Sequence, residues 1–232
     1  QPSLYDLNCG CSVPKVLKNG AGAALLREPE RIGAIIRAMR GETAAPVTVK
    51  IRSGWDLRSI NYADTAACAT EAGAALVCLH PRSRAQGFGG RADWSHLAEL
   101  KRQVSVPVFG SGDLFSAEDA VRMMVETGCD GVMLARGAIG DPFLFARTLR
   151  LFSGLPPPPA ATAGERLRAA LAQLSLAIAL QGEARACRSM RKHFAAYTKG
   201  IPGGSELRRR AVRASREAEY RVLVEEYLGN RV

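Results

Sequence analysis

The sequence predicts an α/β fold, about the last five β-α units of a TIM-type (β/α)8 barrel, followed by a small all-helical domain. Three observations predict it. Short apolar runs alternate with amphipathic helical patterns through the first part of the chain. The loops after these runs are rich in glycine and polar residues, and beyond a run of prolines only helical patterns follow.

Five apolar runs have the length and the Val, Ile and Leu content of strands buried on both faces. They are Leu4–Leu7, Val47–Ile51, Ala75–Leu79, Pro107–Phe109 and Gly131–Leu134. A helical segment separates each run from the next, and crossovers of this kind connect parallel strands. The runs therefore predict one parallel sheet.

Four helical patterns lie between these runs. One starts at Pro29, a second covers Tyr62–Ala72 and a third covers Trp94–Gln103. The fourth runs to Thr127, with Ser116 as its predicted N-cap and a glycine directly after its end. Serine is a preferred residue at the start of a helix and glycine at its end.

The loops after all five predicted strands carry polar residues. An open doubly wound sheet would gather its ligand at one switch point, whereas a barrel uses the carboxyl ends of all its strands. The sequence therefore favours a barrel. A closed barrel takes eight strands and about 250 residues, so we expect three further units to precede Gln1 in the complete protein.

The C-terminal part is organised differently. A proline-rich linker at 156–162 separates the barrel part, 1–155, from a helical domain, 163–232. Prolines restrict the backbone and stiffen such a linker. The predicted helices of this domain are Ala163–Leu180, Glu183–Tyr197 and a single third helix that Ser205 caps and that ends near Leu228.

The formal net charge is +10, and residues 160–232 contribute +7 of it, from 14 Lys and Arg against 7 Asp and Glu. A basic excess in one segment is typical of a protein that binds a polyanion, and solvated helix faces explain it equally well. The composition, 47% hydrophobic and 23% charged, is that of a soluble globular protein. No apolar run is long enough to span a bilayer, so we expect a cytoplasmic monomer with no membrane partner.

Six cysteines are irregularly spaced, and only Cys9 and Cys11 lie close together. A zinc site needs about four ligands, so we expect no metal. A free thiol with a pKa near about 8.5 can donate a proton at neutral pH or, beside a base, act as a nucleophile. Cys11 follows a predicted strand in a Gly-containing loop, three residues after Asn8. Chemistry and simple packing both remain open for it on these grounds.

Cationic residues emerge from two predicted strands. Lys50 and Arg52 alternate at the end of one, and His80 ends the next. Residues two apart on a strand face the same side, and such a pair indicates an anion or an electron-rich ring such as a flavin, whereas His80 by itself is also compatible with a structural role. Glycine-rich loops at Gly110–Asp113 and Ala135–Ala138 follow the last two strands, where barrels commonly bind phosphate, although tight turns explain them too.

In combination and in this order, the motifs resemble those of the tRNA-dihydrouridine synthases, most of all the bacterial B-type branch. The matching segments are 6–12 (DLNCGCS), 20–26, 49–55 (VKIRSGW), 80–82, 85–87, 92–94, 107–113, 131–137 and 190–193, with Tyr197, Lys199 and Gly200. The resemblance implies an FMN-dependent barrel with a helical RNA-binding domain. NADPH would reduce FMN, and a hydride would then pass to C6 of a uracil that is flipped out of tRNA.

The resemblance also implies roles for the matching residues. Cys11 would protonate C5 of the uracil, and Asn8 and Arg52 would contact the substrate. Lys50 and His80 would bind the flavin ring. The loops around the FMN phosphate would supply Gly112, Asp113, Arg136 and Gly137, and the tRNA contacts would be Arg185, Arg188, Arg191, Lys192 and Lys199.

Two residues depart from the family's pattern: Ser12 stands where the family has a proline, and Ser111 stands where it has an asparagine. The family's first three strands complete the flavin site, so we expect this chain alone to bind FMN poorly. Two alternatives remain open. One is another FMN barrel oxidoreductase that acts on a small pyrimidine such as dihydroorotate, which the basic C-terminal segment disfavours, and the other is an RNA-binding fragment without turnover.

Overall fold

The structure is a computed structural model and describes residues 2–229. The chain divides into two compact units, Gln1–Ala135 and Arg136–Val232. Among the described residues, all strands belong to the first unit, and the second consists of helices and their connections. No helix within residues 2–229 combines the length and the apolar character that crossing a membrane requires.

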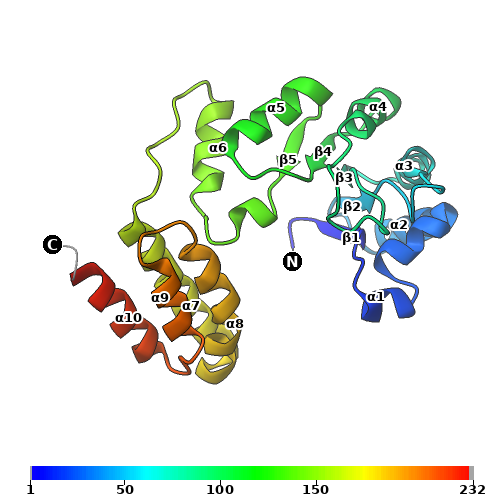
Figure 1. The fold of residues 1–232 in the computed structure, drawn as a ribbon. Coiled ribbons are helices and arrows are strands. Elements are labelled where there is room, and N and C mark those ends of the chain that lie inside the picture. Colours follow the sequence, from blue (N-terminus) through cyan, green and yellow to red (C-terminus); the bar gives the residue numbers. More distant parts are fainter. Residues whose placement is uncertain (1, 230–232) are drawn as a thin grey trace. The chain divides into compact units, whose positions relative to one another are not determined.

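The first unit is built on a parallel five-stranded sheet, in which each strand pairs with the next along the chain (Figure 1). The strands are β1 (Tyr5–Cys9), β2 (Val47–Arg52), β3 (Val77–His80), β4 (Val108–Ser111) and β5 (Gly131–Met133). Every predicted strand is present, with its ends shifted by at most two residues. The predicted α/β class is confirmed, and the strand order is that of consecutive units of a β/α barrel.

Helices connect the strands. Between β1 and β2 lie α1 (Pro14–Lys18), the 3-10 helix η1 (Gly22–Arg27) and α2 (Pro29–Glu42), and later connections contain α3 (Tyr62–Glu71), α4 (Ser95–Gln103) and α5 (Ala117–Thr127). The predicted cap of α5 is confirmed. Ser116 Oγ accepts a hydrogen bond from the Asp119 N–H at 3.1 Å, and the Asp119 carboxylate accepts one from the Ser116 N–H at 3.0 Å.

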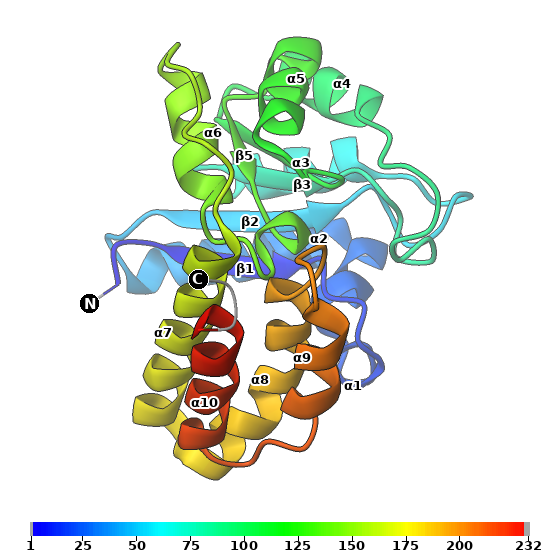
Figure 2. The ribbon, with the colours of Figure 1, turned by 60° about the vertical axis from the view of Figure 1, so that its left-hand side comes forward.

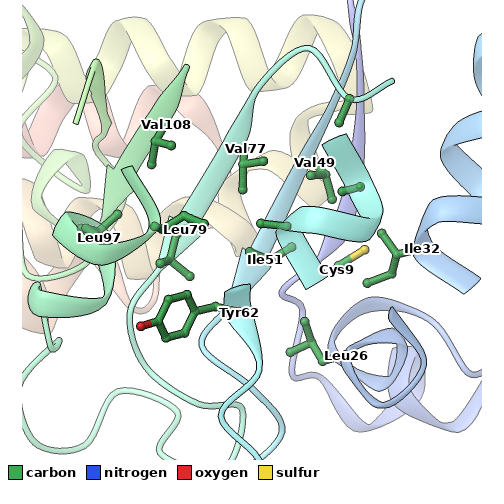
Figure 3. Close-up of a cluster of buried hydrophobic side chains, with 14 of the residues drawn as sticks. Cys9, Leu26, Ile32, Val49, Ile51, Tyr62, Val77, Leu79, Leu97 and Val108 are labelled. Atoms are coloured by element: carbon green, nitrogen blue, oxygen red, sulfur yellow. The ribbon is translucent and has the colours of Figure 1, made fainter. Parts of the chain in front are cut away.

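The outer face of the sheet packs against these helices and forms the core of the first unit. Residues of alternating positions in β2 and β3, among them Ile51 and Leu79, have no exposed surface and lie among helix residues such as Ile32 and Leu97 (Figure 3). Because successive side chains of a strand point to opposite faces, the residues between them point to the inner face. The inner face carries Asn8, Lys50, Arg52, Cys78 and His80.

The second unit contains η2 (Arg136–Ala138), α6 (Leu144–Phe152), α7 (Ala163–Gln181), α8 (Glu183–Tyr197), α9 (Gly204–Ala211) and α10 (Glu217–Gly229). Figure 2 shows α7 to α10 side by side. Their core includes Phe194 and Tyr220, whose rings meet edge to face with centroids 5.3 Å apart. The predicted helices at α7 and α8 are therefore present.

The prediction of one helix from Ser205 to about Leu228 is wrong, because two helices occupy this segment. Helix α9 ends at Ala211. Ala214 belongs to the segment that connects the two helices, and its side chain is buried in the core of the unit. The carboxylate of Glu219 then accepts hydrogen bonds from the N–H groups of Ser215 at 2.6 Å and Arg216 at 3.0 Å. These bonds satisfy backbone donors at the start of α10 and so favour a new helix. The predicted cap is also wrong, since α9 begins after Gly203 without a side-chain cap.

Along the chain, the boundary between the two compact units falls between β5 and η2. Helix α6 therefore belongs to the second unit. The predicted boundaries place α6 in the barrel part, 1–155. Residues 156–162 contain neither helix nor strand and lead into α7, where Thr162 and Glu165 form a capping box. The functional domain boundary at 156–162 stays a prediction.

Candidate active site on the first unit

Polar residues of three neighbouring strands line up on the inner face of the sheet. In the ladder, Asn8 of β1 lies beside Lys50 of β2, and Lys50 lies beside Cys78 of β3. One layer closer to the carboxyl ends, Arg52 lies beside His80. The structure therefore brings together four residues that the sequence analysis assigned to the flavin or the substrate.

The loop that carries Cys11 is held by hydrogen bonds at its backbone. Asn8 Oδ1 accepts hydrogen bonds from the N–H groups of Gly10 at 3.0 Å and Cys11 at 3.1 Å. The carbonyl oxygen of Cys11 accepts a third bond from the N–H of Ala23 in η1, at 2.9 Å. Asn8 thus uses its side-chain oxygen to shape the loop, and its side-chain nitrogen is the group that could meet a substrate.

Close packing of η1 against this loop requires a glycine at position 22. Gly22 has φ of 60°, and a Cβ there would lie 2.7 Å from the carbonyl oxygen of Cys11 and 3.0 Å from its Cβ. Any larger residue would push the loop away from η1. Gly22 is therefore a positioning residue that the sequence analysis did not single out. Its motif, 20–26, was the available signal.

The two neighbouring cysteines of β1 and its loop lie in different surroundings. Cys9 has no exposed surface and packs in the core, where burial and, to a smaller extent, Asp6 raise the pKa of its thiol to about 12. Burial likewise raises the pKa of Cys78 to about 11. Cys11 is half-buried, so its thiol is within reach of a bound molecule. Of these three thiols, Cys11 is the one suited to proton transfer.

Arg52 is bound to loops on both sides of β2. Its Nε donates a hydrogen bond to the carbonyl of Gly10 at 2.9 Å, and its Nη1 donates to the carbonyls of Ser83 at 3.2 Å and Gly87 at 3.0 Å. The side chain is 5% exposed. Arg52 therefore ties the Cys11 loop to the loop after β3, and its predicted contact with the substrate stays a prediction.

A buried ion pair anchors the loops after β3 and β4. Nη1 and Nη2 of Arg82 donate to the two carboxylate oxygens of Asp113, at 2.9 and 2.8 Å, and further bonds run from Nε to the carbonyl of Gly89 and from Nη2 to the carbonyl of Gly90. The Asp113 carboxylate also accepts a bond from the N–H of Ala92. This bidentate pair is strong and fixes both loops. Asp113 therefore holds the loop after β4 in place, and its predicted part in binding the FMN phosphate stays a prediction.

Gly112 lies directly against His80. With φ of 110°, it has a backbone that only glycine adopts readily, and a Cβ there would lie 2.8 Å from Cδ2 of His80. Arg82 Nη1 lies 3.5 Å from Nε2 of the same imidazole. His80 is thus held between Gly112, in the loop after β4, and Arg82. Arg82 was visible in the 80–82 motif, but its partner lies 31 residues away and no local pattern links them.

The remaining predicted residues lie in the second unit. Arg136 and Gly137 form η2, and their contact with the FMN phosphate stays a prediction. On α8, Arg185, Arg188 and Lys192 are exposed and share one helix face, since they are three and four residues apart. Lys199 is exposed in the turn after α8.

Arg191 differs from these neighbours on α8. Its Nη2 donates to the carbonyl of Ala214 at 3.3 Å, and its Nε is buried. It therefore links α8 to the connection between α9 and α10. Its predicted role in binding tRNA stays a prediction.

One further group has the residue types of a nucleophile triad. Ser53 Oγ lies 2.9 Å from Nδ1 of His96, and Nε2 of His96 lies 3.7 Å from the carboxylate of Asp93. Ser53 has no exposed surface, so it cannot reach a substrate. Within residues 2–229, His, Cys, Asp and Glu do not gather in any group of three or more that could hold a metal ion.

Comparison with known proteins identifies the family of the chain. The family model described as Dihydrouridine synthase (Dus) matches residues 3–230. A probable tRNA-dihydrouridine synthase of Treponema pallidum (strain Nichols) is 44% identical over 97% of this chain and 68% of its own length. Similar relatives are a probable tRNA-dihydrouridine synthase of Mycobacterium leprae (strain TN), with 45% identity over 88% of this chain, and tRNA-dihydrouridine synthase B of Pseudomonas putida, with 36% identity over 89%.

The chain spans 68% of the length of the first of these relatives, 54% of the second and 61% of the third. The family model covers nearly all of the chain. The chain belongs to the dihydrouridine synthase family.

Proposed function

We propose that this protein reduces a uridine of tRNA to 5,6-dihydrouridine, with FMN as its cofactor and NADPH as the reductant. The observation that carries the proposal is the position of Cys11. Its loop is held rigidly at the carboxyl end of β1, beside the inner face that carries Lys50 and His80. In β/α barrels, the active site lies at this end of the strands.

The residues of the inner face fit a flavin. Lys50 supplies a cation next to Asn8, a buried imidazole is available at His80, and Gly112 keeps the backbone close to that imidazole. Lys50 and His80 would hold the ring system, and the glycine loop of β4 would lie at the phosphate. When it is bound and reduced, FMN supplies the hydride for C6 of the uracil.

Cys11 supplies the proton in this proposal. Its Sγ–H bond breaks and a C–H bond forms at C5 of the uracil, while C6 accepts the hydride and the C5–C6 double bond is lost. The thiolate that remains takes a proton from water. The three hydrogen bonds that hold the loop keep the thiol in one place, and such positioning reduces the entropic cost of the step. A positioned acid of this kind contributes about 10²–10⁴ in rate.

The tRNA partner is supported by the second unit. The exposed face of α8 with Arg185, Arg188 and Lys192, followed by Lys199, offers positive charge without base-specific geometry. Folded RNA is recognised largely through its shape and phosphates, so such a face suits it. In the proposal, the protein is a cytoplasmic monomer.

The test is a reconstitution of the reaction. Because we expect this chain to bind FMN poorly, it is incubated with a large excess of FMN, an unmodified tRNA transcript and either NADPH or NADH, and mass spectrometry follows the gain of two hydrogens at uridine. We expect a gain that depends on FMN and is larger with NADPH.

Two other outcomes would contradict the proposal. Binding of tRNA without any gain would favour an RNA-binding fragment without turnover. Reduction of a free pyrimidine, with tRNA left unchanged, would favour the other oxidoreductase class.

A further inference from the structure

Two arginines of the first unit stack on one tryptophan at the carboxyl ends of the strands. The guanidinium carbon of Arg27 lies 3.6 Å from the ring centroid of Trp55, and that of Arg84 lies 4.2 Å from it. Both distances are well within the range of a cation–π contact. Two positive charges therefore share a single aromatic ring.

The backbone around this stack is fixed. The N–H groups of Arg84 and Ala85 donate to the carbonyls of Gly54 and Trp55, at 2.8 and 2.9 Å, so the loops after β2 and β3 continue side by side beyond the sheet. Arg27 ends η1, and the preceding carbonyl, that of Leu26, accepts a hydrogen bond from Asn61 Nδ2 at 2.7 Å. The three side chains thus meet on well-anchored elements.

Neither guanidinium has a hydrogen bond or ion pair with any residue in the described range 2–229. The nearest acidic residues along the chain have other partners. Glu28 pairs with Arg31 at 3.5 Å, and the carboxylate of Asp56 accepts hydrogen bonds from Arg58 N–H and Ser59 Oγ. Stacking occupies a face of a guanidinium and leaves its N–H edge available for a planar or tetrahedral anion.

A second stack in the same unit shows the contrast. Arg122 of α5 lies over Trp94 at 5.0 Å, but its guanidinium pairs with Asp119 at 3.0 Å and with Glu126 at 3.8 Å. Its charge is neutralised within the protein. The charges of Arg27 and Arg84 are not, although the stacking chemistry is the same.

The stack belongs to the same loops as the candidate active site. Arg84 follows His80 in one loop, Trp55 follows Arg52 in another, and Arg27 belongs to η1, which is hydrogen bonded to the Cys11 loop through Ala23. Next to Trp55 and Arg84 along the chain, a groove of about 440 Å³ is lined by Asp56, Leu57, Arg58, Ala85 and Gln86. These shared loops put the stack near the place where a nucleotide beside Cys11 would continue into its strand.

We propose that Arg27, Trp55 and Arg84 form a clamp that binds the RNA phosphates next to the reacting uridine. The ring orients both guanidiniums, and their N–H edges bind two phosphate oxygens or neighbouring phosphates. The inference rests on the proposed function because it takes tRNA as the polyanion. It assigns the first unit a binding surface of its own, separate from the basic face of α8.

The test measures the affinity of the full chain for an unmodified tRNA transcript over a range of salt concentrations. The variants are Arg27→Gln, Arg84→Gln and their combination, and Arg122→Gln is the matched control. Each lost phosphate contact should reduce the slope of log K against log salt by about 0.7–0.9, which corresponds to roughly fivefold weaker binding at 0.1 M salt. Arg122→Gln should leave both slope and affinity unchanged.

An unchanged slope of log K against log salt in the double Gln variant would overturn the clamp. If the melting temperature of this variant falls at the same time, the stack serves stability alone. If a Gln variant does not fold, Arg27→Lys and Arg84→Lys replace it. Lysine keeps the charge and loses the planar stack, so the slope should stay and the affinity should fall. A full loss of slope in the Lys variants contradicts the proposal.

Dihydrouridine formation is measured separately on the same samples. If no dihydrouridine forms but the slope of log K against log salt falls in the Gln variants, the clamp is supported and the proposed activity is contradicted. A chain that makes dihydrouridine with an unchanged slope rejects the clamp alone, and a chain that does not bind tRNA rejects it as well.

Discussion

The two faces of the five-stranded sheet are made from the same strands and differ in the polarity and charge of their side chains. On the outer face, Val49, Ile51 and Leu79 have no exposed surface and pack against helices. On the inner face, Lys50, Arg52 and His80 lie between them along the same strands. Successive residues of a strand point to opposite faces. Neighbouring residues of one strand can therefore serve different purposes, one packing in the core and the next lining the candidate site.

Two cysteines that are only two residues apart also differ in their surroundings. Cys9 ends β1 on the outer face, and Cys11 lies beyond the strand, where Asn8 turns the loop. Burial raises the pKa of the Cys9 thiol and closes it off from any bound molecule, whereas the Cys11 thiol is only half-buried and stays accessible.

The largest expected effect separates these two cysteines. Cys11→Ala should lower dihydrouridine formation by about 10²–10⁴, because the proton donor is lost. Cys9→Ala should keep the turnover of the folded protein and lower its stability instead, because a buried group is removed. Mass analysis of tRNA and thermal unfolding measure the two effects. Equal turnover of both variants would remove the distinction between the faces.

The next effect concerns the buried ion pair. Asp113 has a left-handed backbone with φ of 59°, which asparagine also tolerates. Asp113→Asn removes the charge that faces Arg82, whose side chain is 1% exposed, and should cost about 3 kcal/mol of unfolding free energy. The control is Glu206→Ala, which breaks an exposed pair with Arg209 and should leave the unfolding free energy nearly unchanged, because solvent screens exposed pairs. Denaturant unfolding that gives equal losses would contradict a structural role for the pair.

A third pair of variants compares how much the outer and the inner face of the sheet contribute to stability. Leu79→Ala deletes core volume on the outer face and should cost about 2–5 kcal/mol of unfolding free energy. Lys50→Met replaces a half-buried cation of the inner face by an apolar side chain of similar length, so the stability should change by less than about 1 kcal/mol. The affinity for added FMN, measured by absorbance titration, should fall in Lys50→Met. A large loss of stability in Lys50→Met would mean that the inner face also supports the fold.

The smallest effect depends on pH. The hydrogen bond from Lys101, together with one from the Val108 N–H, lowers the pKa of Asp130 below its ordinary 3.8. A carboxyl whose pKa is lower in the folded state stabilises the protein above pH 4 and loses this contribution as the pH falls through the folded pKa. Asp130 is 38% exposed, so the contribution is less than about 1 kcal/mol.

Asp130→Asn should therefore melt at a lower temperature than the parent at pH 7. The gap should close as the pH falls below about 4, because the parent carboxyl then becomes protonated. A gap that stays constant from pH 7 to pH 3 would show that charge has no part in it.

The sequence by itself determined the strands, most of the helices and the loops that carry chemistry. Apolar runs, Ser116 and Gly128 are local signals, and the structure places the strands within two residues of the prediction. The family was also evident from short motifs, because their residue types and their order along the chain are local features of the sequence. The role of Cys11 as a proton donor follows from the resemblance and stays a prediction.

Only the tertiary structure decided what several of those side chains do. Arg52 binds three carbonyls of distant loops, Asp113 pairs with Arg82 across 31 residues, and Arg191 turns inward to Ala214. The break between α9 and α10 likewise depends on Ala214 fitting the core. Periodicity and caps act within one turn or one strand, whereas the partner of a charged side chain depends on which loops the folded chain brings together.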